Sequence, residues 1–215
     1  MLPLRDVNPS HSTPILTWLL IAANVGVFWH YHDPALFEEA IYQLGYIPAE
    51  GFSLEKALTS MFMHGGWGHL FFNMWTLWVF GDNVEDALGK VGYALLYVSS
   101  GIGAVLTHAA LYPFSETPIV GASGAISGVM GAYLVLYPRA EILTWVPPWF
   151  LTVFSARFFL VLWFVLQLLQ GIADQFVNWI GGAAAGIAFW AHVGGFAVGW
   201  MLSRIVGGQT RERLL

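Results

Sequence analysis

The chain has 215 residues, of which 57% are hydrophobic and 10% are charged, and its formal net charge is -5. A typical soluble domain is about 25% charged, so this composition excludes an ordinary soluble fold and indicates a membrane protein. The eight lysines and arginines are too few and too scattered for a nucleic-acid partner. The absence of cysteine excludes disulfides, thiol catalysis and cysteine-ligated metals.

Six apolar segments predict six membrane-spanning helices, because a spanning helix needs about 20 largely apolar residues. The predicted helices cover 14–32, 62–81, 92–112, 122–137, 157–177 and 181–204. The first segment is too long for the hydrophobic region of a signal peptide, so we expect no signal peptide. The fold class predicted is an all-α polytopic membrane protein, with one domain over 1–215 and short tails.

The segment 142–156 is apolar but contains Pro147 and Pro148. We interpret it as an interfacial loop, with Trp145 and Trp149 at the level of the lipid headgroups.

Lysine and arginine are unevenly distributed between the predicted loops. If the N-terminus is inside, seven of the eight fall on the inner side, and Lys56 alone falls outside. This pattern predicts that both termini are cytoplasmic. The expected location is a prokaryotic plasma (inner) membrane, and the lipid bilayer is an expected partner.

With this topology the predicted helices 62–81, 122–137 and 181–204 all run inward from the outer surface. Each carries a polar residue that is costly in hydrocarbon and therefore needs a functional reason. His69 is expected about two turns into its helix, and Ser123 at the start of its own. His192 is expected deeper, about 16 Å along its helix at 1.5 Å per residue.

Ser123 and His192 suggest a nucleophile and its general base, since a serine hydroxyl is weak until a base activates it. Gly121 and Gly124 flank the serine and allow close approach of backbone, and free N–H groups at the helix start can bind an oxyanion. The alternative interpretation of this short motif is a contact between helices through small residues.

Glycines recur on the two helices that carry this pair. They are Gly124, Gly128, Gly131, Gly195 and Gly199. Small faces on both helices predict close backbone contact, which brings Ser123 within reach of His192.

His69 and Asn73 are four residues apart and therefore share a helix face. We interpret them as oxyanion donors, with an interhelical hydrogen bond as the alternative for Asn73. His64 is interpreted as a supporting or structural residue. A metal site of His64, His69 and His192 lacks a nearby carboxylate, so no metal and no cofactor are expected.

No acidic residue lies inside the core of any predicted helix. A third member of a catalytic triad is therefore missing, and a two-residue Ser–His catalyst is predicted. An aspartyl intramembrane protease is excluded, because it would need two buried aspartates.

These motifs together resemble the rhomboid family of intramembrane serine proteases. The matching segments are HGGWGHLFFN at 64–73, GASGAISG at 121–128, AHVGG at 191–195, and GDNVE at 81–85 with Gly89. The resemblance implies a six-helix bundle, a dyad of Ser123 and His192, and an oxyanion site with His69 and Asn73. It also implies transmembrane protein substrates, cleaved within or beside their membrane segments.

Two features depart from this family. Members often carry an aromatic residue four positions after the nucleophile, where it stacks on the histidine, and this chain has Ser127 there. His192 must therefore be oriented in another way. The first outer loop, about 33–60, lacks a Trp-Arg pair found in some members.

Two other functions compete with proteolysis. A non-catalytic rhomboid-like protein that binds and escorts transmembrane helices would lack the nucleophile or the base, and both are present. A small transporter would place charged or paired polar residues along a path through the membrane. The inner halves of the predicted helices contain none.

Overall fold

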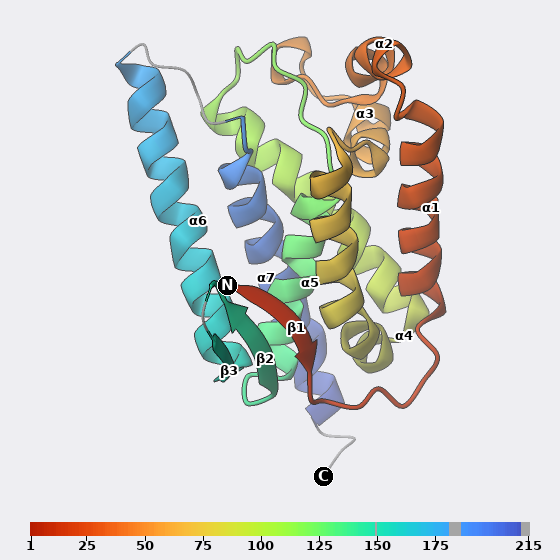
Figure 1. Cartoon of the computed structure of the whole chain (residues 1–215), viewed down its shortest axis with the longest axis vertical. Helices are drawn as coiled ribbons and strands as arrows, with labels where there is room; N and C mark the ends of the chain where they lie inside the picture. Colours follow the sequence, from red (N-terminus) through yellow and green to blue (C-terminus); the bar gives the residue numbers. More distant parts are fainter. Residues whose placement is uncertain (149, 181–185, 212–215) are drawn as a thin grey trace.

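The structure is a computed structural model that describes residues 1–148, 150–180 and 186–211, and it is mostly helical (Figure 1). The α-helices of this part are α1 (Ile15–Tyr31), α2 (Pro34–Leu44), α3 (Leu54–Thr59), α4 (Trp67–Leu111), α5 (Ser123–Leu136), α6 (Ala156–Trp179) and α7 (Phe189–Arg211). Two short 3-10 turns are η1 (Pro48–Glu50) and η2 (Ser60–Phe62). The tail 212–215 of the predicted single domain lies outside the described residues.

α4 contains two of the predicted helices as two arms that meet at Gly89. The φ of Gly89 is +67°, a left-handed value that favours glycine and interrupts the helical path. The bounds predicted for the helix 62–81 are wrong at both ends, because the first arm begins at Trp67 and continues to about Gly89. Glycines at 65 and 66 do not propagate a helix, so the chain becomes helical only after them.

This longer arm corrects the expectation that no acidic residue lies inside the core of a helix. Glu85 is in α4, is 2% exposed, and accepts hydrogen bonds from the backbone N–H groups of Leu16 and Thr17 at 3.0 and 2.8 Å. The hydroxyl of Thr17 also donates a hydrogen bond to the Glu85 carboxylate, at 2.9 Å. The carboxylate thus satisfies free donors at the start of α1, where the helix dipole favours a negative charge.

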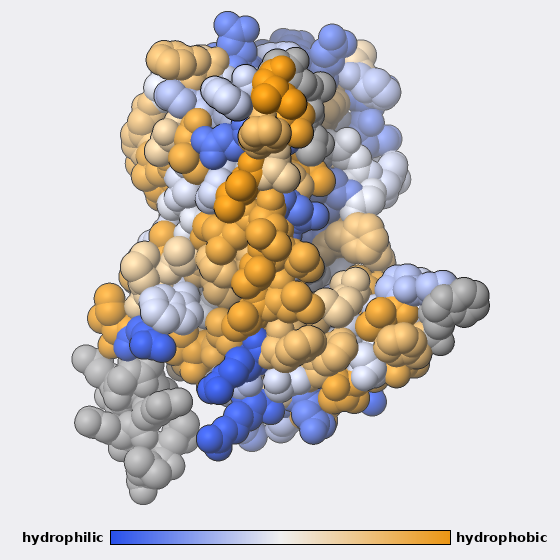
Figure 2. Space-filling model, turned by 90° about the vertical axis from the view of Figure 1, so that its left-hand side faces the viewer, coloured by the Kyte–Doolittle hydropathy of each residue, from blue (hydrophilic) through white to orange (hydrophobic). Residues whose placement is uncertain are grey.

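Within the described residues, α4 and α6 are long and apolar enough to cross a membrane, and α1 and α5 are shorter apolar helices. Figure 2 shows the face that includes α6, where hydrophobic residues form a continuous surface. Large apolar side chains of α6 are exposed, including Val165, Leu169 and Phe176. Such a surface is stable against lipid and unfavourable against water.

A three-stranded antiparallel sheet corrects the all-α prediction and the interfacial loop at 142–156. Its strands are β1 (Leu2–Asp6), β2 (Glu141–Val146) and β3 (Phe150–Ser155), in the order β1-β2-β3. The strands β2 and β3 are rich in β-branched and aromatic residues, and the two prolines lie in the turn between them. Trp145 is exposed on β2, while Trp149 lies outside the described residues.

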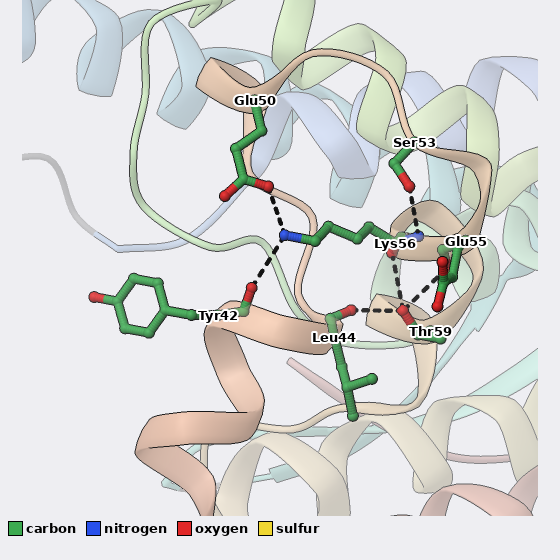
Figure 3. Close-up of polar contacts among 7 residues, drawn as sticks. All are labelled: Tyr42, Leu44, Glu50, Ser53, Glu55, Lys56 and Thr59. Atoms are coloured by element: carbon green, nitrogen blue, oxygen red, sulfur yellow. Dashed lines mark hydrogen bonds and ion pairs between the residues drawn. The ribbon is translucent and has the colours of Figure 1, made fainter.

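The segment 33–60, predicted as the first outer loop, is held by polar contacts among α2, η1 and α3 (Figure 3). Lys56 donates to a carboxylate oxygen of Glu50 at 2.5 Å and to the carbonyl of Tyr42 at 3.1 Å. The hydroxyl of Thr59 donates to the carbonyl of Leu44 at 2.7 Å, and Ser53 caps α3. These bonds connect α2 with the chain that leads into α4.

α5 lies between α7 and the arms of α4, and most of its residues are buried. The predicted glycine contact is confirmed. A Cβ atom at Gly195 would lie 1.9 Å from the carbonyl oxygen of Gly124, and one at Gly199 would lie 2.0 Å from that of Gly128. The backbones of α5 and α7 therefore touch, and no larger residue fits between them.

α7 begins later than the predicted helix 181–204. Residues 181–185 lie outside the described residues, 186–188 are not helical, and the helix begins at Phe189. Hydropathy did not locate this start, because the preceding glycines and alanines are as apolar as the helix itself.

Asp6 supplies a pH-dependent contribution to stability at the end of β1. It accepts a hydrogen bond from the hydroxyl of Tyr133 at 2.5 Å, and burial raises the pKa of its carboxyl from 3.8 to about 6. The folded protein therefore holds this proton more tightly than the unfolded chain does. Its stability falls as the pH rises from about 4 to about 6, and stays lower above that range.

We predict that Asp6→Asn melts at a higher temperature than the wild type at about pH 7.5, and that the difference disappears near pH 4. Asparagine keeps an acceptor for Tyr133 and carries no charge. Thermal melting in detergent at both pH values measures this, with the exposed loop variant Glu116→Gln as control. A melting temperature below that of the wild type at pH 7.5 would contradict the prediction.

Candidate active site

Ser123 and His192 meet where α5 and α7 begin. The hydroxyl of Ser123 donates to Nε2 of His192 at 2.8 Å. Ser123 is the first residue of α5, as the sequence predicted, and His192 is in the first turn of α7. His192 therefore does not lie about 16 Å along its helix, because α7 starts at Phe189 rather than at 181. In Figure 1, α5 and α7 begin below the upper end of α6.

His69 is likewise in the first turn of its helix rather than two turns into it, because α4 begins at Trp67. The starts of α4, α5 and α7 thus converge. Helix starts carry backbone N–H groups without helical partners, and α5 has no side-chain cap at Ala122. The site therefore combines side-chain donors with backbone donors.

Gly121 separates the start of α5 from the side chains of α4. Its φ is +120°, a value that L-residues rarely adopt, and a Cβ there would lie 2.6 Å from Nε2 of His69 and 3.8 Å from the amide nitrogen of Asn73. Any larger residue would therefore fill the space that these two side chains face. Gly121 leaves room beside Ser123 for an atom that accepts hydrogen bonds.

The hydrogen bonds of His69 and Asn73 orient them toward that space. The backbone N–H of Gly65 donates to Nδ1 of His69 at 3.4 Å, so in the neutral ring the proton is on Nε2, which is near Gly121. The Asn73 amide donates one proton to the carbonyl of His69 at 3.0 Å and keeps a second.

His64, Gly124 and Ser127, which together with Gly121 are the possible supporting residues of the predicted site, have different surroundings. His64 is 1% exposed, and its ring centroid lies 5.0 Å from that of His69, so it packs against His69 from within the protein. A Cβ at Gly124 would lie 2.4 Å from that of Ala104 on α4. The hydroxyl of Ser127 donates to the carbonyl of Ser123 at 2.6 Å and therefore returns to its own helix.

Two residues of α6 were not identified from the sequence. Nδ1 of His192 lies 2.7 Å from the amide oxygen of Gln167. The ring of Trp163 lies 6.0 Å from the imidazole between centroids, at an angle of 35°. Gln167 carried a usable signal, because an amide in an apolar helix is costly and marks a functional residue by default.

A cavity of about 1580 Å³ contains this site, and its walls include His69, Asn73, Ser123, Trp163 and His192. It extends to the loop before α5, where Phe114 and Glu116 are exposed. Water can therefore be supplied to polar groups that lie between apolar helices.

The geometry is suited to acyl transfer. A hydroxyl hydrogen-bonded to an imidazole nitrogen is the arrangement of an activated nucleophile and its base. The donors around Gly121 lie next to the hydroxyl, where a carbonyl oxygen would gain charge on attack.

Comparison with known proteins identifies the family. The model of the Rhomboid domain matches residues 52–209. The chain is 29% identical over 219 residues to "Rhomboid protein 1, mitochondrial" of Saccharomyces cerevisiae, covering 93% of this chain and 56% of that protein. It is 33% identical over 130 residues to "Putative rhomboid protease YdcA" of Bacillus subtilis, covering 57% of this chain and 62% of that protein.

A shorter match of 79 residues, 40% identical, is to "Rhomboid protease GluP" of Bacillus subtilis and covers 37% of this chain and 15% of that protein. The chain thus spans less than two thirds of the length of each of these curated relatives. The domain match, in contrast, includes α4, α5, α6 and most of α7, and every residue of the site. The chain therefore belongs to the rhomboid family of polytopic membrane proteins.

Proposed function

We propose that this protein is an intramembrane serine endopeptidase that cleaves transmembrane proteins within or beside their membrane segments. The observation that carries the proposal is the hydrogen bond of 2.8 Å between the Ser123 hydroxyl and Nε2 of His192. Three further points support it: the cavity, the donors around Gly121 and the names of the relatives.

In the proposed reaction, Nε2 of His192 takes the proton of Ser123 while the serine oxygen attacks the carbonyl carbon of the scissile peptide. The carbonyl oxygen becomes an oxyanion beside Gly121, where His69, Asn73 and backbone N–H groups donate hydrogen bonds. When the C–N bond breaks, His192 gives its proton to the leaving amine. Water then attacks the carbonyl carbon of the acyl-enzyme while His192 accepts its proton. When the ester bond to Ser123 breaks, His192 returns the proton to the serine oxygen.

We further propose that six helices span the membrane: α1, the two arms of α4, α5, α6 and α7. The 14 residues of α5 give a length of about 21 Å, which is shorter than a hydrocarbon core of about 30 Å. Ser123, at the outer end of so short a helix, would lie below the outer surface. We retain the cytoplasmic placement of both termini and the plasma membrane as proposals that follow from the distribution of lysine and arginine.

A substrate helix must unwind locally before attack, because its peptide carbonyls are engaged in helical hydrogen bonds. We therefore expect substrates with small or helix-breaking residues near the scissile bond.

The test is incubation of the purified protein with a membrane-anchored reporter, with and without a fluorophosphonate. We expect cleavage that the inhibitor abolishes, and covalent labelling at Ser123 in the wild type and not in His192→Ala. Binding of the reporter without cleavage and without labelling would support the escort function instead. Labelling of His192→Ala at the wild-type rate would show that another group activates Ser123.

Asn73→Ala is predicted to lower kcat by about 10- to 100-fold with little change in KM. Loss of one oxyanion donor lowers the rate of soluble proteases by about 10²–10³-fold. Here Nε2 of His69 lies closer than the Asn73 amide to the open space at Gly121, so we expect it to compensate in part. The matched control is Thr76→Ala, which removes a similar bond to the carbonyl four residues earlier on α4. A change confined to KM would instead make Asn73 a substrate contact.

A further inference from the structure

The orientation of His192 requires a partner for its second ring nitrogen. To accept the proton of Ser123, Nε2 must be unprotonated, so in the neutral ring the hydrogen must lie on Nδ1. That hydrogen needs an acceptor within the protein. The amide oxygen of Gln167 lies 2.7 Å from Nδ1, a strong hydrogen-bond distance.

We propose that Gln167 of α6 is the positioning residue of the base: it accepts the Nδ1 hydrogen and thereby fixes both the tautomer and the direction of the His192 ring. The proposal rests on the proposed proteolytic function. Gln167 takes no proton at any step. When Nε2 gains the serine proton, the Nδ1 hydrogen stays in place, and the amide dipole stabilises the positive charge on the ring.

The hydrogen bond of Ser127 supports this assignment. Ser127 stands at the position where family members often carry a stacking aromatic, and its hydroxyl donates to its own helix, so it does not hold the ring of His192. The amide nitrogen of Gln167 makes a long, exposed contact of 3.5 Å with the side-chain oxygen of Gln170, which is too weak to decide the direction of the amide. In the described part of the chain, the side-chain hydrogen bonds of His192 thus run to Ser123 and Gln167.

Trp163 lies one turn before Gln167 on the same face of α6 and adds an aromatic contact to the ring. The same face continues at Gly171, where a Cβ would lie 3.0 Å from the indole of Trp190 on α7. Otherwise α6 is poorly buried: four of its 24 residues, near its start and at Gly171, are buried. The ring of the base is therefore held by a peripheral helix.

The experiment compares Gln167→Leu, Gln167→Glu and the control Gln170→Leu in reporter cleavage, fluorophosphonate labelling and thermal melting. Leucine suits this apolar helix and removes the acceptor. We expect Gln167→Leu to lower kcat and the labelling rate by about 10- to 100-fold, with KM within about twofold, because a bond to the charged ring is lost. Gln170 is exposed, so its variant should match the wild type.

Gln167→Glu keeps an acceptor and adds a negative charge next to the ring. We expect it to retain cleavage, and to move the acid limb of the kcat/KM profile to higher pH, because the carboxylate stabilises the protonated base. A merely structural glutamine would not produce this shift. If Gln167→Leu also melts at a lower temperature, the pH profile of Gln167→Glu decides between a positioning role and a purely structural role for Gln167.

Wild-type kcat and labelling in a folded Gln167→Leu, or an unshifted profile in an active Gln167→Glu, would overturn the role of Gln167 and leave the proposed function intact. A wild-type protein that neither cleaves the reporter nor reacts at Ser123 would overturn both.

Discussion

Ser123→Ala is expected to lower kcat for reporter cleavage by at least about 10⁴-fold, because removal of the nucleophile of a soluble serine protease costs about 10⁶. The same variant should melt within a few degrees of the wild type. The serine hydroxyl makes its side-chain bond to His192, and alanine fits the same small space at the start of α5. Cleavage of a transmembrane reporter, followed by gel and mass spectrometry, measures the first effect, and thermal melting in detergent measures the second.

Ser127→Ala is the matched control for this variant. Ser127 is also a serine of α5, it is 2% exposed, and its hydroxyl donates to the carbonyl of Ser123 rather than to His192. We expect its kcat to stay within about tenfold of the wild type, since an internal hydrogen bond of this kind contributes only about 1 kcal/mol. Near-normal cleavage by Ser123→Ala would remove the serine from the mechanism.

The position of Ser123 could be predicted because its motif marks a helix start. Gly121 breaks the preceding chain, and an apolar segment without charges follows the serine. Glycines at intervals of three and four residues also predicted the contact of α5 with α7, which the structure confirms. Backbone contact needs only the absence of side chains, and that absence is visible in a sequence.

The starts of α4 and α7 could not be predicted from hydropathy. Residues before Trp67 and before Phe189 are mostly apolar or glycine, with His64 as the exception, so the composition changes little where the helix begins. Hydropathy records which residues tolerate lipid, and it does not record whether their backbone is helical. This error placed His69 and His192 too far along their helices.

The sheet was missed for a related reason. The segment 142–156 is apolar on both sides, so it lacks the alternation that identifies a strand with one solvated face. Its partner β1 lies more than a hundred residues earlier in the chain, and pairing at such a distance leaves no local pattern.

Gln167 shows a further limit of the sequence. The missing aromatic at Ser127 indicated that His192 is oriented by another residue, but apolar helices give little information on which faces meet. The contact joins α6 to α7 across 25 residues of the chain. Only the packing of the two helices identifies the partner.

The second large effect is expected from Gly195→Ala, which places a methyl group between α5 and α7. That methyl would lie 1.9 Å from the carbonyl oxygen of Gly124, a distance that no side chain tolerates. The atoms that the methyl would meet all belong to the backbone of Gly124, so no side chain can change rotamer to make room, and the helices must separate. We expect the free energy of unfolding to fall by about 1–3 kcal/mol or more.

The rate of cleavage should fall by more than the loss of folded protein alone would explain. Gly195 is three residues after His192 and contacts the residue after Ser123, so separation at this point lengthens the hydrogen bond of the dyad directly. A misplacement of about 1 Å can cost about 100-fold in rate. Gly199→Ala, one turn deeper, meets the carbonyl oxygen of Gly128 at 2.0 Å and should destabilise to a similar degree with a smaller loss of labelling at Ser123.

The control is Gly26→Ala on α1, where an added methyl meets no atom within 4 Å. Alanine is favoured over glycine within a helix by about 1 kcal/mol, so this variant should melt at or above the wild-type temperature with unchanged cleavage. Thermal melting and the rate of fluorophosphonate labelling, measured on all three variants, separate packing from catalysis. If Gly195→Ala melted and reacted as Gly26→Ala does, the backbones of α5 and α7 would not be in contact, and the approach of Ser123 to His192 would need another explanation.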